Sequence, residues 1–254
     1  MSEGLRAQFE RDGYVLVQGV FSKTEAKDLR AEGHGIIERL SSRYDTNGTW
    51  STAAEAGALG GSSLQHCHDV QFHSAKFSRM LTDPRLVDVA AEVMDSPNVE
   101  LHHNKLFVKP PANGSPFPMH QDWPFFPHAN DSVIAAVVHL DDAGEEQGCF
   151  KVMPGSHRLG RIPHVGDRHW HLPTDEFPLG TALAVPAKAG DVLVFGCLTV
   201  HGSGVNVSDR PRTTWLLQLR DPADEPTVDR HRSPGQGTML RGRNEARPLP
   251  PTVL

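Results

Sequence analysis

Two histidines and one aspartate have the types and spacing that could hold a reactive metal ion. His120 and Asp122 are separated by one residue in the segment His120-Gln121-Asp122. Alternate residues of a β-strand point to the same face, so both side chains can reach one ion if this segment is extended. Such a pair occurs by chance in many chains, and alone it is weak evidence.

A third candidate ligand, His201, follows an apolar segment at 191–196 that is typical of a β-strand. Two histidines and one carboxylate form the facial triad of non-haem Fe(II) enzymes, which leaves three coordination positions open on one side of the metal. We therefore expect His120, Asp122 and His201 to bind iron and to leave room for reacting molecules.

A cosubstrate with a carboxylate would need a cation at its far end, and Arg212 follows His201 by eleven positions. The planar guanidinium can pair with a carboxylate through two hydrogen bonds. Ser203, two residues after His201, could donate another. The alternative for Arg212 is an ordinary surface salt bridge.

Several short blocks of sequence, taken in order, resemble the phytanoyl-CoA dioxygenase family of Fe(II)- and 2-oxoglutarate-dependent oxygenases. They span most of residues 9–220 and are more specific together than any block alone. The blocks are Phe9-Glu10-Arg11-Asp12-Gly13-Tyr14-Val15, Lys109-Pro110-Pro111, Met119-His120-Gln121-Asp122-Trp123, Gly148-Cys149-Phe150, Met153-Pro154-Gly155-Ser156-His157, and His201-Gly202-Ser203-Gly204-Val205-Asn206 with Arg212.

The resemblance implies a double-stranded β-helix, also called a jelly roll, of the cupin-like kind. It implies that His120, Asp122 and His201 hold Fe(II), and that Arg212 and Ser203 bind the distal carboxylate of 2-oxoglutarate. The implied reaction uses O2 to convert 2-oxoglutarate to succinate and CO2 while a substrate C–H bond is oxidised. The cofactor carries the difficult chemistry and the protein supplies geometry.

The resemblance also suggests further cosubstrate contacts from the strand before the His-x-Asp pair, where Asn104 and Lys105 are the candidates. The resemblance suggests another cosubstrate contact from the strand after the pair, where some relatives have a tryptophan and this chain has Val138. Halogenating relatives carry Gly or Ala in place of the aspartate, so Asp122 indicates a hydroxylase-type enzyme rather than a halogenase.

Candidate substrate contacts are Trp123 and Phe125, directly after the metal pair, together with His102 and Gln71. Small-molecule sites are usually aromatic with a few polar groups, although packing at the mouth of a barrel would use the same residues. On a regular strand His102 and its neighbour His103 point to opposite faces, so at most one should look into the barrel. Zinc is not expected at the histidine cluster in 66–73, where substrate lining or surface exposure is expected instead. The segment that contains His164, His169 and His171 departs from the strand pattern, and insertions of this kind often border the active site in the implied fold, although the roles of both segments are left open.

These residues must be positioned by a mainly β fold with flanking α-helices. Helical spacing covers 5–40, with a break at Gly13 and an N-cap at Ser22, and returns over 77–94, where Asp83 precedes a proline. Residues 41–65 are expected to form a loop. Short apolar runs with turn signals then predict strands at 99–108, 133–140, 149–153, 182–185, 191–196 and 213–219.

We interpret residues 1–254 as a single domain. It has a mostly helical part at 1–98, a jelly-roll core at 99–220 and an irregular arm at 221–254, where proline and arginine are frequent.

Composition excludes several classes of protein. The chain has 254 residues and a net charge of -6, and no cationic block is suited to nucleic acid. No apolar run is long enough to cross a membrane, and the first residues lack the pattern of a signal peptide. Three scattered cysteines fit a reducing compartment, so we expect a soluble cytoplasmic protein. The oligomeric state is left open.

We therefore expect an oxygenase that hydroxylates, or otherwise oxidises at C–H, a small organic molecule, in the setting of secondary metabolism. Desaturation, epoxidation and ring closure remain open as outcomes. A fatty acyl-CoA-type hydroxylase is the alternative within this class. The alternatives from other classes are a non-catalytic jelly roll that binds a metal or ligand, and a metal-dependent isomerase or cupin-type dioxygenase that needs no cosubstrate.

Overall fold

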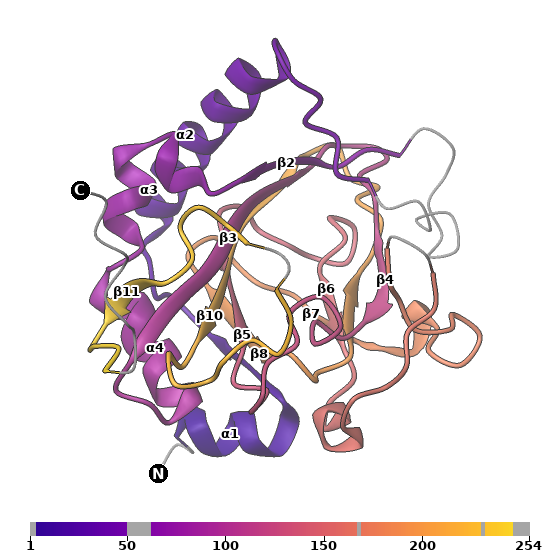
Figure 1. Cartoon of the computed structure of the whole chain (residues 1–254). Coiled ribbons are helices and arrows are strands. Elements are labelled where there is room, and N and C mark those ends of the chain that lie inside the picture. Colours follow the sequence, from indigo (N-terminus) through magenta and orange to yellow (C-terminus); the bar gives the residue numbers. More distant parts are fainter. Residues whose placement is uncertain (1–3, 50–61, 167–168, 230–231, 246–254) are drawn as a thin grey trace.

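Four α-helices and two antiparallel β-sheets make up the molecule described by the computed structural model, which covers residues 4–49, 62–166, 169–229 and 232–245 (Figure 1). The helices are α1 (Leu5–Asp12), α2 (Lys23–Ser41), α3 (Ala75–Met80) and α4 (Pro84–Met94). The strands are β1 (Tyr14–Val17), β2 (Gln65–His68), β3 (Val99–Lys109), β4 (Phe117–His120), β5 (Ile134–His139), β6 (Phe150–Val152), β7 (Leu183–Val185), β8 (Val192–Gly196), β9 (His201–Ser203), β10 (Arg212–Arg220) and β11 (Thr238–Arg241). Short 3₁₀ helices lie at Val70–Phe72, Ser156–Leu159 and Leu179–Thr181.

The larger sheet has the order β1-β8-β5-β10-β3-β11, and β2 pairs with another part of β3. The smaller sheet has the order β4-β9-β6-β7. The two sheets pack through apolar side chains that both contribute, such as Val137 and Phe195 from the larger and Phe150 and Val152 from the smaller. This is the predicted cupin-like jelly roll, and the fold class is confirmed.

Side chains alternate between the two faces of the larger sheet. On β10, Trp215, Leu217 and Leu219 belong to the core beneath the helices, whereas Leu216 packs with the cluster between the sheets. Period-two alternation of this kind buries both faces of a central strand, one on each layer. The face toward the smaller sheet is the one that can carry a site.

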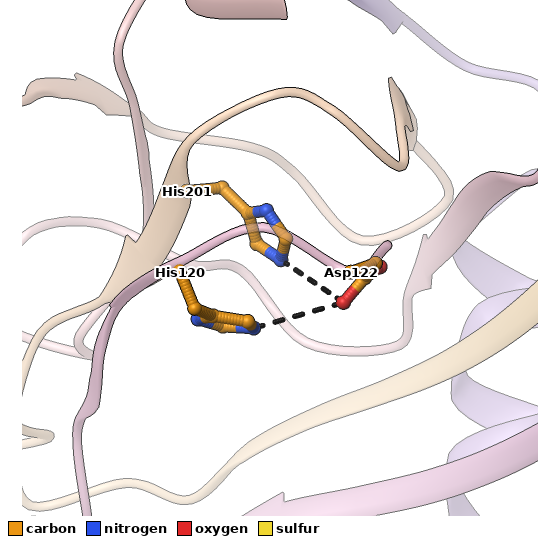
Figure 2. A group of neighbouring side chains, drawn as sticks. All are labelled: His120, Asp122 and His201. Atoms are coloured by element: carbon orange, nitrogen blue, oxygen red, sulfur yellow. Dashed lines mark ion pairs between the residues drawn. The ribbon is translucent and has the colours of Figure 1, made fainter. Parts of the chain in front are cut away.

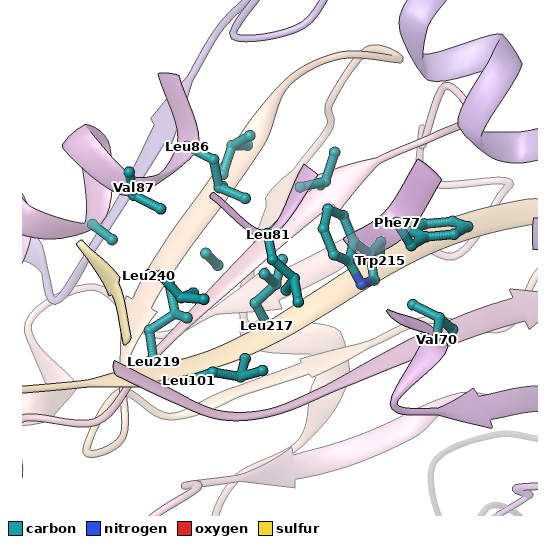
Figure 3. Close-up of a cluster of buried hydrophobic side chains, with 14 of the residues drawn as sticks. Val70, Phe77, Leu81, Leu86, Val87, Leu101, Trp215, Leu217, Leu219 and Leu240 are labelled. Atoms are coloured by element: carbon teal, nitrogen blue, oxygen red, sulfur yellow. The ribbon is translucent and has the colours of Figure 1, made fainter. Parts of the chain in front are cut away.

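The helices α2, α3 and α4 cover the opposite face of this sheet (Figure 1). Phe77 of α3 lies edge-on to Trp215 of β10, with ring centroids 5.2 Å apart. Figure 3 shows this layer, in which Leu86 and Val87 of α4 extend the packing toward Leu240 of β11. The helical layer holds the long strands in place from behind the site.

The predicted helix signals act as expected. Ser22 and Glu25 form a reciprocal capping box at the start of α2, which satisfies two backbone N–H groups that the helix would otherwise leave free. Asp83 caps α4, and Pro84 occupies its first turn, where a missing N–H costs nothing. Over the described residues, no helix has both the length and the apolar character of a membrane span.

Several short strands lie outside the expected ranges, among them β4 and β9 of the smaller sheet and three strands of the larger one. Residues 14–17 form β1 rather than helix, because Gly13 at φ 81° ends α1 and the next four residues pair with β8. The end of the expected loop at 41–65 enters β2, while its residues 50–61 lie outside the described part. The expected irregular arm contains β11, which pairs with β3, and residues 246–254 also lie outside the described part.

A bulge in β3 overturns one further expectation. Gln218 of β10 pairs with His103 and the next residue, Leu219, pairs with Leu101, so His102 is an extra residue in the strand. His102 and His103 therefore lie close together instead of on opposite faces, with their Nδ1 atoms 2.7 Å apart. Both rings contact Phe126, at centroid distances of 5.0 and 4.8 Å.

Candidate active site

The three predicted metal ligands converge between the sheets (Figure 2). One carboxylate oxygen of Asp122, Oδ1, lies 3.7 Å from Nε2 of His120 and 3.8 Å from Nε2 of His201. All three side chains are buried. Within the described ranges, they form the one group of three or more His, Cys, Asp or Glu side chains close enough to share a metal ion.

Two neighbouring strands and a bend position these ligands. His120 ends β4 and pairs directly with His201 at the start of β9. Asp122 lies just beyond β4 and not within a strand, contrary to the extended pair assumed from spacing. The backbone N–H groups of Asp122 and Trp123 both donate to the carbonyl of Cys197, at 2.9 and 3.1 Å, and this fixes the bend that returns the carboxylate to the histidines.

Backbone contacts select the histidine nitrogen that faces the site. Nδ1 of His120 lies 2.8 Å from the carbonyl of Pro118, and Nδ1 of His201 lies 2.9 Å from the carbonyl of Thr199. A carbonyl can only accept, so both Nδ1 atoms donate and both Nε2 atoms keep a lone pair for a metal. Burial, with the nearby His201, also holds the pKa of His120 well below its usual value, which favours the neutral ligand form.

The carboxylate is oriented by a residue that the sequence analysis did not single out. Nε2 of Gln218 on β10 donates to Oδ2 of Asp122 at 2.8 Å, which leaves Oδ1 facing the two histidines. The carbonyl oxygen of this buried glutamine has no hydrogen-bond partner. In the sequence, the one signal for this role of Gln218 is that it follows Arg212 by six residues on the same strand, β10.

This donor set fits Fe(II). Two neutral imidazole nitrogens and one carboxylate oxygen, gathered on one side of a cavity, are the ligands that non-haem Fe(II) centres use while keeping positions open. The cavity has a volume of about 550 Å³, and all three ligands line it. A small organic molecule fits a space of this size.

One end of this cavity is cationic. Arg212 is buried, donates to the carbonyl of Gly148 at 3.1 Å, and has its guanidinium 5.2 Å from the ring centroid of Phe150. Lys109, its partner in the β3–β10 register, is also buried and donates to the hydroxyl of Ser203 at 2.8 Å. Arg212 and Lys109 have no salt bridge to an acidic side chain anywhere in the described ranges.

The electrostatics of this end favour an added anion. Burial, reinforced by the nearby Arg212 charge, holds the pKa of Lys109 well below its usual value. Burial lowers the pKa of Arg212 to about 10. The adjacent His139 on β5 is buried, and burial lowers its pKa to about 3. An anion here would relieve the cost of burying two cations together.

Lys109 and His139 were not predicted as site residues. Lys109 lies in the quoted Lys-Pro-Pro block, so its charge beside proline was a usable signal. His139 ends an apolar run, and nothing in the sequence indicated that it would lie beside the site. The predicted anchors Arg212 and Ser203 are brought together around Lys109, although Arg212 alone of the three lines the described cavity.

The two candidates on β3 point in opposite directions. Lys105 lines the cavity. Asn104 lies on the helix-covered face, where its Oδ1 accepts from Nε1 of Trp215 at 3.0 Å and its amide donates to Gln71 at 2.5 Å. Asn104 and Gln71 therefore do not line the cavity. Val138, the position compared with tryptophan, also belongs to the core beneath the helices.

Of the remaining predicted substrate contacts, one lines the cavity and two do not. Phe125 lines the cavity. Trp123 does not: its indole donates to Gln121, and its ring lies under the guanidinium of Arg161, 5.4 Å from the centroid. His102 is 2% exposed and lies behind Phe126, away from the cavity lining.

The histidine-rich segments 66–73 and 164–171 do contribute side chains to the cavity wall. His66 and His68 of β2 and His169 line the cavity, together with Trp170. Their positions depend on how β2 and the 164–171 segment fold over the barrel. No local spacing in the sequence could have predicted that arrangement.

Comparison with known proteins agrees with this geometry. The phytanoyl-CoA dioxygenase (PhyH) family model matches residues 9–214. An ectoine dioxygenase from Bordetella bronchiseptica is 29% identical over 231 residues, covering 82% of this chain and 72% of that protein. A probable alpha-ketoglutarate-dependent hypophosphite dioxygenase from Stutzerimonas stutzeri is 27% identical over 216 residues, covering 81% and 73%.

Among solved structures, the epimerase SnoN in complex with Fe3+, alpha ketoglutarate and nogalamycin RO superposes with a TM-score of 0.72. It is 26% identical, and the match covers 93% of this chain and 97% of that one. Because the family model spans most of the chain and the ordered blocks converge on one cavity, this protein belongs to the phytanoyl-CoA dioxygenase family.

Proposed function

We propose that this protein is an Fe(II)- and 2-oxoglutarate-dependent oxygenase that oxidises a C–H bond of a small organic molecule. The observation that carries the proposal is the layout of one cavity. Three metal ligands line its wall, and a buried arginine without an acidic partner among the described residues lines the same space.

The residues have separate tasks in this proposal. His120, Asp122 and His201 would hold Fe(II), which together with 2-oxoglutarate and O2 supplies the oxidising power when bound. Arg212 would form a two-point contact with the distal carboxylate of 2-oxoglutarate. Lys109 would add a second positive charge and hold the Ser203 hydroxyl in place. The buried site would keep bulk water from the reacting atoms.

The carboxylate of Asp122 argues against halogenation. It would occupy the coordination position on the metal that a halide needs in a halogenase. The second carboxylate oxygen is tied to Gln218, so the side chain is held in the orientation that a ligand needs. We therefore propose hydroxylation or a related C–H oxidation.

We also propose a small substrate of secondary metabolism in preference to an acyl-CoA. The cavity of about 550 Å³ suits a drug-sized molecule. The relatives named above act on, or are bound to, ectoine, hypophosphite and a nogalamycin compound, which are small molecules. All three cysteines are free and buried, which supports a cytoplasmic setting.

Succinate formation tests the function directly. Purified protein supplied with Fe(II), 2-oxoglutarate and O2 should form succinate slowly even without its substrate. Anaerobic addition of Fe(II) and 2-oxoglutarate should produce a weak visible charge-transfer band. His120→Ala should abolish both signals. A protein that binds iron but forms neither succinate nor the band would instead support the non-catalytic jelly roll or an enzyme without a cosubstrate.

The role of Arg212 is tested by Arg212→Ala, which should raise the KM for 2-oxoglutarate by about 10- to 100-fold, the value of a charged hydrogen-bonded contact. Arg210→Ala is the matched control, because Arg210 is an exposed arginine two residues away. An unchanged KM in Arg212→Ala would remove Arg212 from the cosubstrate site.

Epimerisation is a second candidate, favoured by the likeness to SnoN at 26% identity. A hydroxylase adds an oxygen atom to its product, whereas an epimerase returns hydrogen to the same carbon. Once a substrate is found, the product mass separates the two. A gain of 16 mass units indicates hydroxylation, and an unchanged mass with inverted configuration indicates epimerisation.

A further inference from the structure

Lys105 lines the cavity, and its ammonium forms no salt bridge or hydrogen bond with any described residue. It lies away from the cationic end formed by Arg212 and Lys109. We infer that Lys105 binds an anionic group of the substrate, and that the substrate is an organic acid with an apolar body. This inference rests on the proposed function and names the substrate class for the same cavity.

The register of the strands separates Lys105 from the cosubstrate anchors. Lys109 pairs with Arg212, whereas Lys105 pairs with Leu216 further along β10. Four residues of strand correspond to roughly 13 Å between the two lysine Cα atoms. The sequence analysis grouped Lys105 with the cosubstrate, but a 2-oxoglutarate held at Arg212 and the metal leaves Lys105 for another ligand.

No described carboxylate forms a salt bridge with Lys105. Asp122 and Asp69 are the carboxylates that influence Lys105 electrostatically, and neither forms a salt bridge with it. Asp122 would be engaged by the metal, and Asp69 already accepts hydrogen bonds from Gln71 and Ser233. Lys105 is half-buried, and an ammonium partly withdrawn from water is less costly when an opposite charge joins it, so an anion would complete this site.

The walls next to Lys105 indicate the rest of the ligand. Its ammonium lies 5.9 Å from the ring centroid of Phe126, and Phe107, Phe125 and Trp170 line the same cavity. Aromatic walls bury apolar surface, while one cation fixes the orientation of the ligand. A carboxylate at Lys105 would place the apolar body along these rings, beside the metal ligands.

Matched pairs of probes test this inference on the full-length protein loaded with Ni(II), which does not turn over, and saturated with 2-oxoglutarate. The probes are phenylacetate with phenylacetamide, and 3-phenylpropanoate with its amide. Each pair has the same apolar body and differs in charge. Calorimetric titration should show the carboxylates binding at least about tenfold more tightly than their amides, as expected for a charge-assisted contact.

Substitutions of Lys105 then test whether this residue causes the preference for the carboxylate probes. Lys105→Met should remove the preference for the carboxylate while the amides bind as before, and Lys105→Arg should retain it. The control Lys27→Met changes an exposed helical lysine and should behave as wild type. Equal binding of both members of each pair, no carboxylate binding up to 10 mM (about the weakest binding such a contact allows), or a preference that survives Lys105→Met would overturn the inference.

The same variants separate this inference from the proposed function. The control Lys27→Met should keep the KM for 2-oxoglutarate and the slow succinate formation without substrate within about twofold of wild type, and the KM for 2-oxoglutarate of Lys105→Met is compared with it. A large rise in that KM would return Lys105 to the cosubstrate site and refute the substrate role. If wild type itself neither binds 2-oxoglutarate nor forms succinate, the proposed function fails instead.

Discussion

Asp122 depends on one side chain, Gln218, for the orientation of its carboxylate. Residues that hydrogen-bond to a metal ligand typically contribute a factor of 10 to 100 in metal affinity. Gln218→Leu should therefore weaken Co(II) or Fe(II) binding by about that factor, because Asp122 could then rotate away from the histidines. Anaerobic metal titration measures this effect.

The comparison for Gln218 is Gln8→Leu, which changes a half-buried glutamine of α1 that lies outside the cavity. Rescue by Gln218→Asn should be partial, since its amide is one methylene shorter. If Gln218→Leu binds the metal as tightly as Gln8→Leu does, the hydrogen bond to Asp122 has no positioning role.

The lowered pKa of Lys109 leads to a prediction of how 2-oxoglutarate binding depends on pH. Its pKa is lowered by burial and by Arg212, so the free enzyme loses this charge at a lower pH than an ordinary lysine does. Binding of dianionic 2-oxoglutarate favours the protonated lysine, so affinity should fall as the pH rises through the pKa of the free enzyme. The KM for 2-oxoglutarate in wild type should thus rise with increasing pH, and the rise should begin below the ordinary lysine pKa of about 10.4.

Lys109→Arg keeps the positive charge at all these pH values and should flatten the rise in KM. Lys109→Met should raise the KM at pH 7 and also remove the dependence on pH. A wild-type KM that depends on pH in the same way as the KM of Lys109→Arg, or that falls as the pH rises, contradicts the proposed part of Lys109 in binding.

At the scale of single residues, sequence reasoning succeeded where the signal was local. His120, Asp122 and His201 followed from spacing and from the ordered blocks. Lys105 and Asn104 were named together, but strand alternation sends only Lys105 into the cavity. No pattern in the sequence could show that alternation relative to the site, because the direction depends on which face the helices cover.

At the scale of elements, the loop between β5 and β6 supports the cationic end. Gly148 adopts φ +66°, and a Cβ atom there would overlap the carbonyl oxygen of Gly204. Its own carbonyl accepts the hydrogen bond from Arg212. Gly148→Ala should destabilise the fold by at least about 1–2 kcal/mol, from the positive φ alone, and should also raise the KM for 2-oxoglutarate.

Gly144→Ala in the same loop is the control for this prediction. A Cβ atom there meets only the end of the flexible Gln147 side chain, and the backbone is unstrained. Urea unfolding and steady-state kinetics distinguish the two variants. Equal stability and equal KM in both would show that the contact at Gly148 does not position Arg212.

The strands that the sequence missed are short, namely β1, β2 and β11 in the larger sheet and β4 and β9 in the smaller sheet. β1, β2 and β11 have four residues each, and each gains its structure by pairing with β8 or β3. The long strands β3 and β10 carry enough apolar alternation to be predicted alone. A four-residue strand depends on its partner, which local sequence does not reveal.

The molecule as a whole buries many imidazoles in their neutral form. Among the described residues, burial is the main cause of a lowered pKa in His34, His66, His120, His128, His139 and His164. The unfolded chain binds protons at these groups near pH 6.5, whereas the folded chain resists them. Stability of the metal-free protein should therefore be greatest above pH 6.5 and fall as the pH decreases.

His139 allows this effect to be isolated, because it is fully buried and its pKa is lowered to about 3. Below pH 6.5 it should cost stability that increases until about pH 3, which amounts to about 2 kcal/mol at pH 5. His139→Leu should then be less sensitive to acid than wild type by that amount. Urea unfolding of the chelator-treated proteins at pH 7.5 and pH 5 measures the difference, with exposed His73→Leu as the control. If both variants lose as much stability as wild type between these pH values, His139 already carries a proton in the folded protein, and the cavity end beside Arg212 is better solvated than its packing indicates.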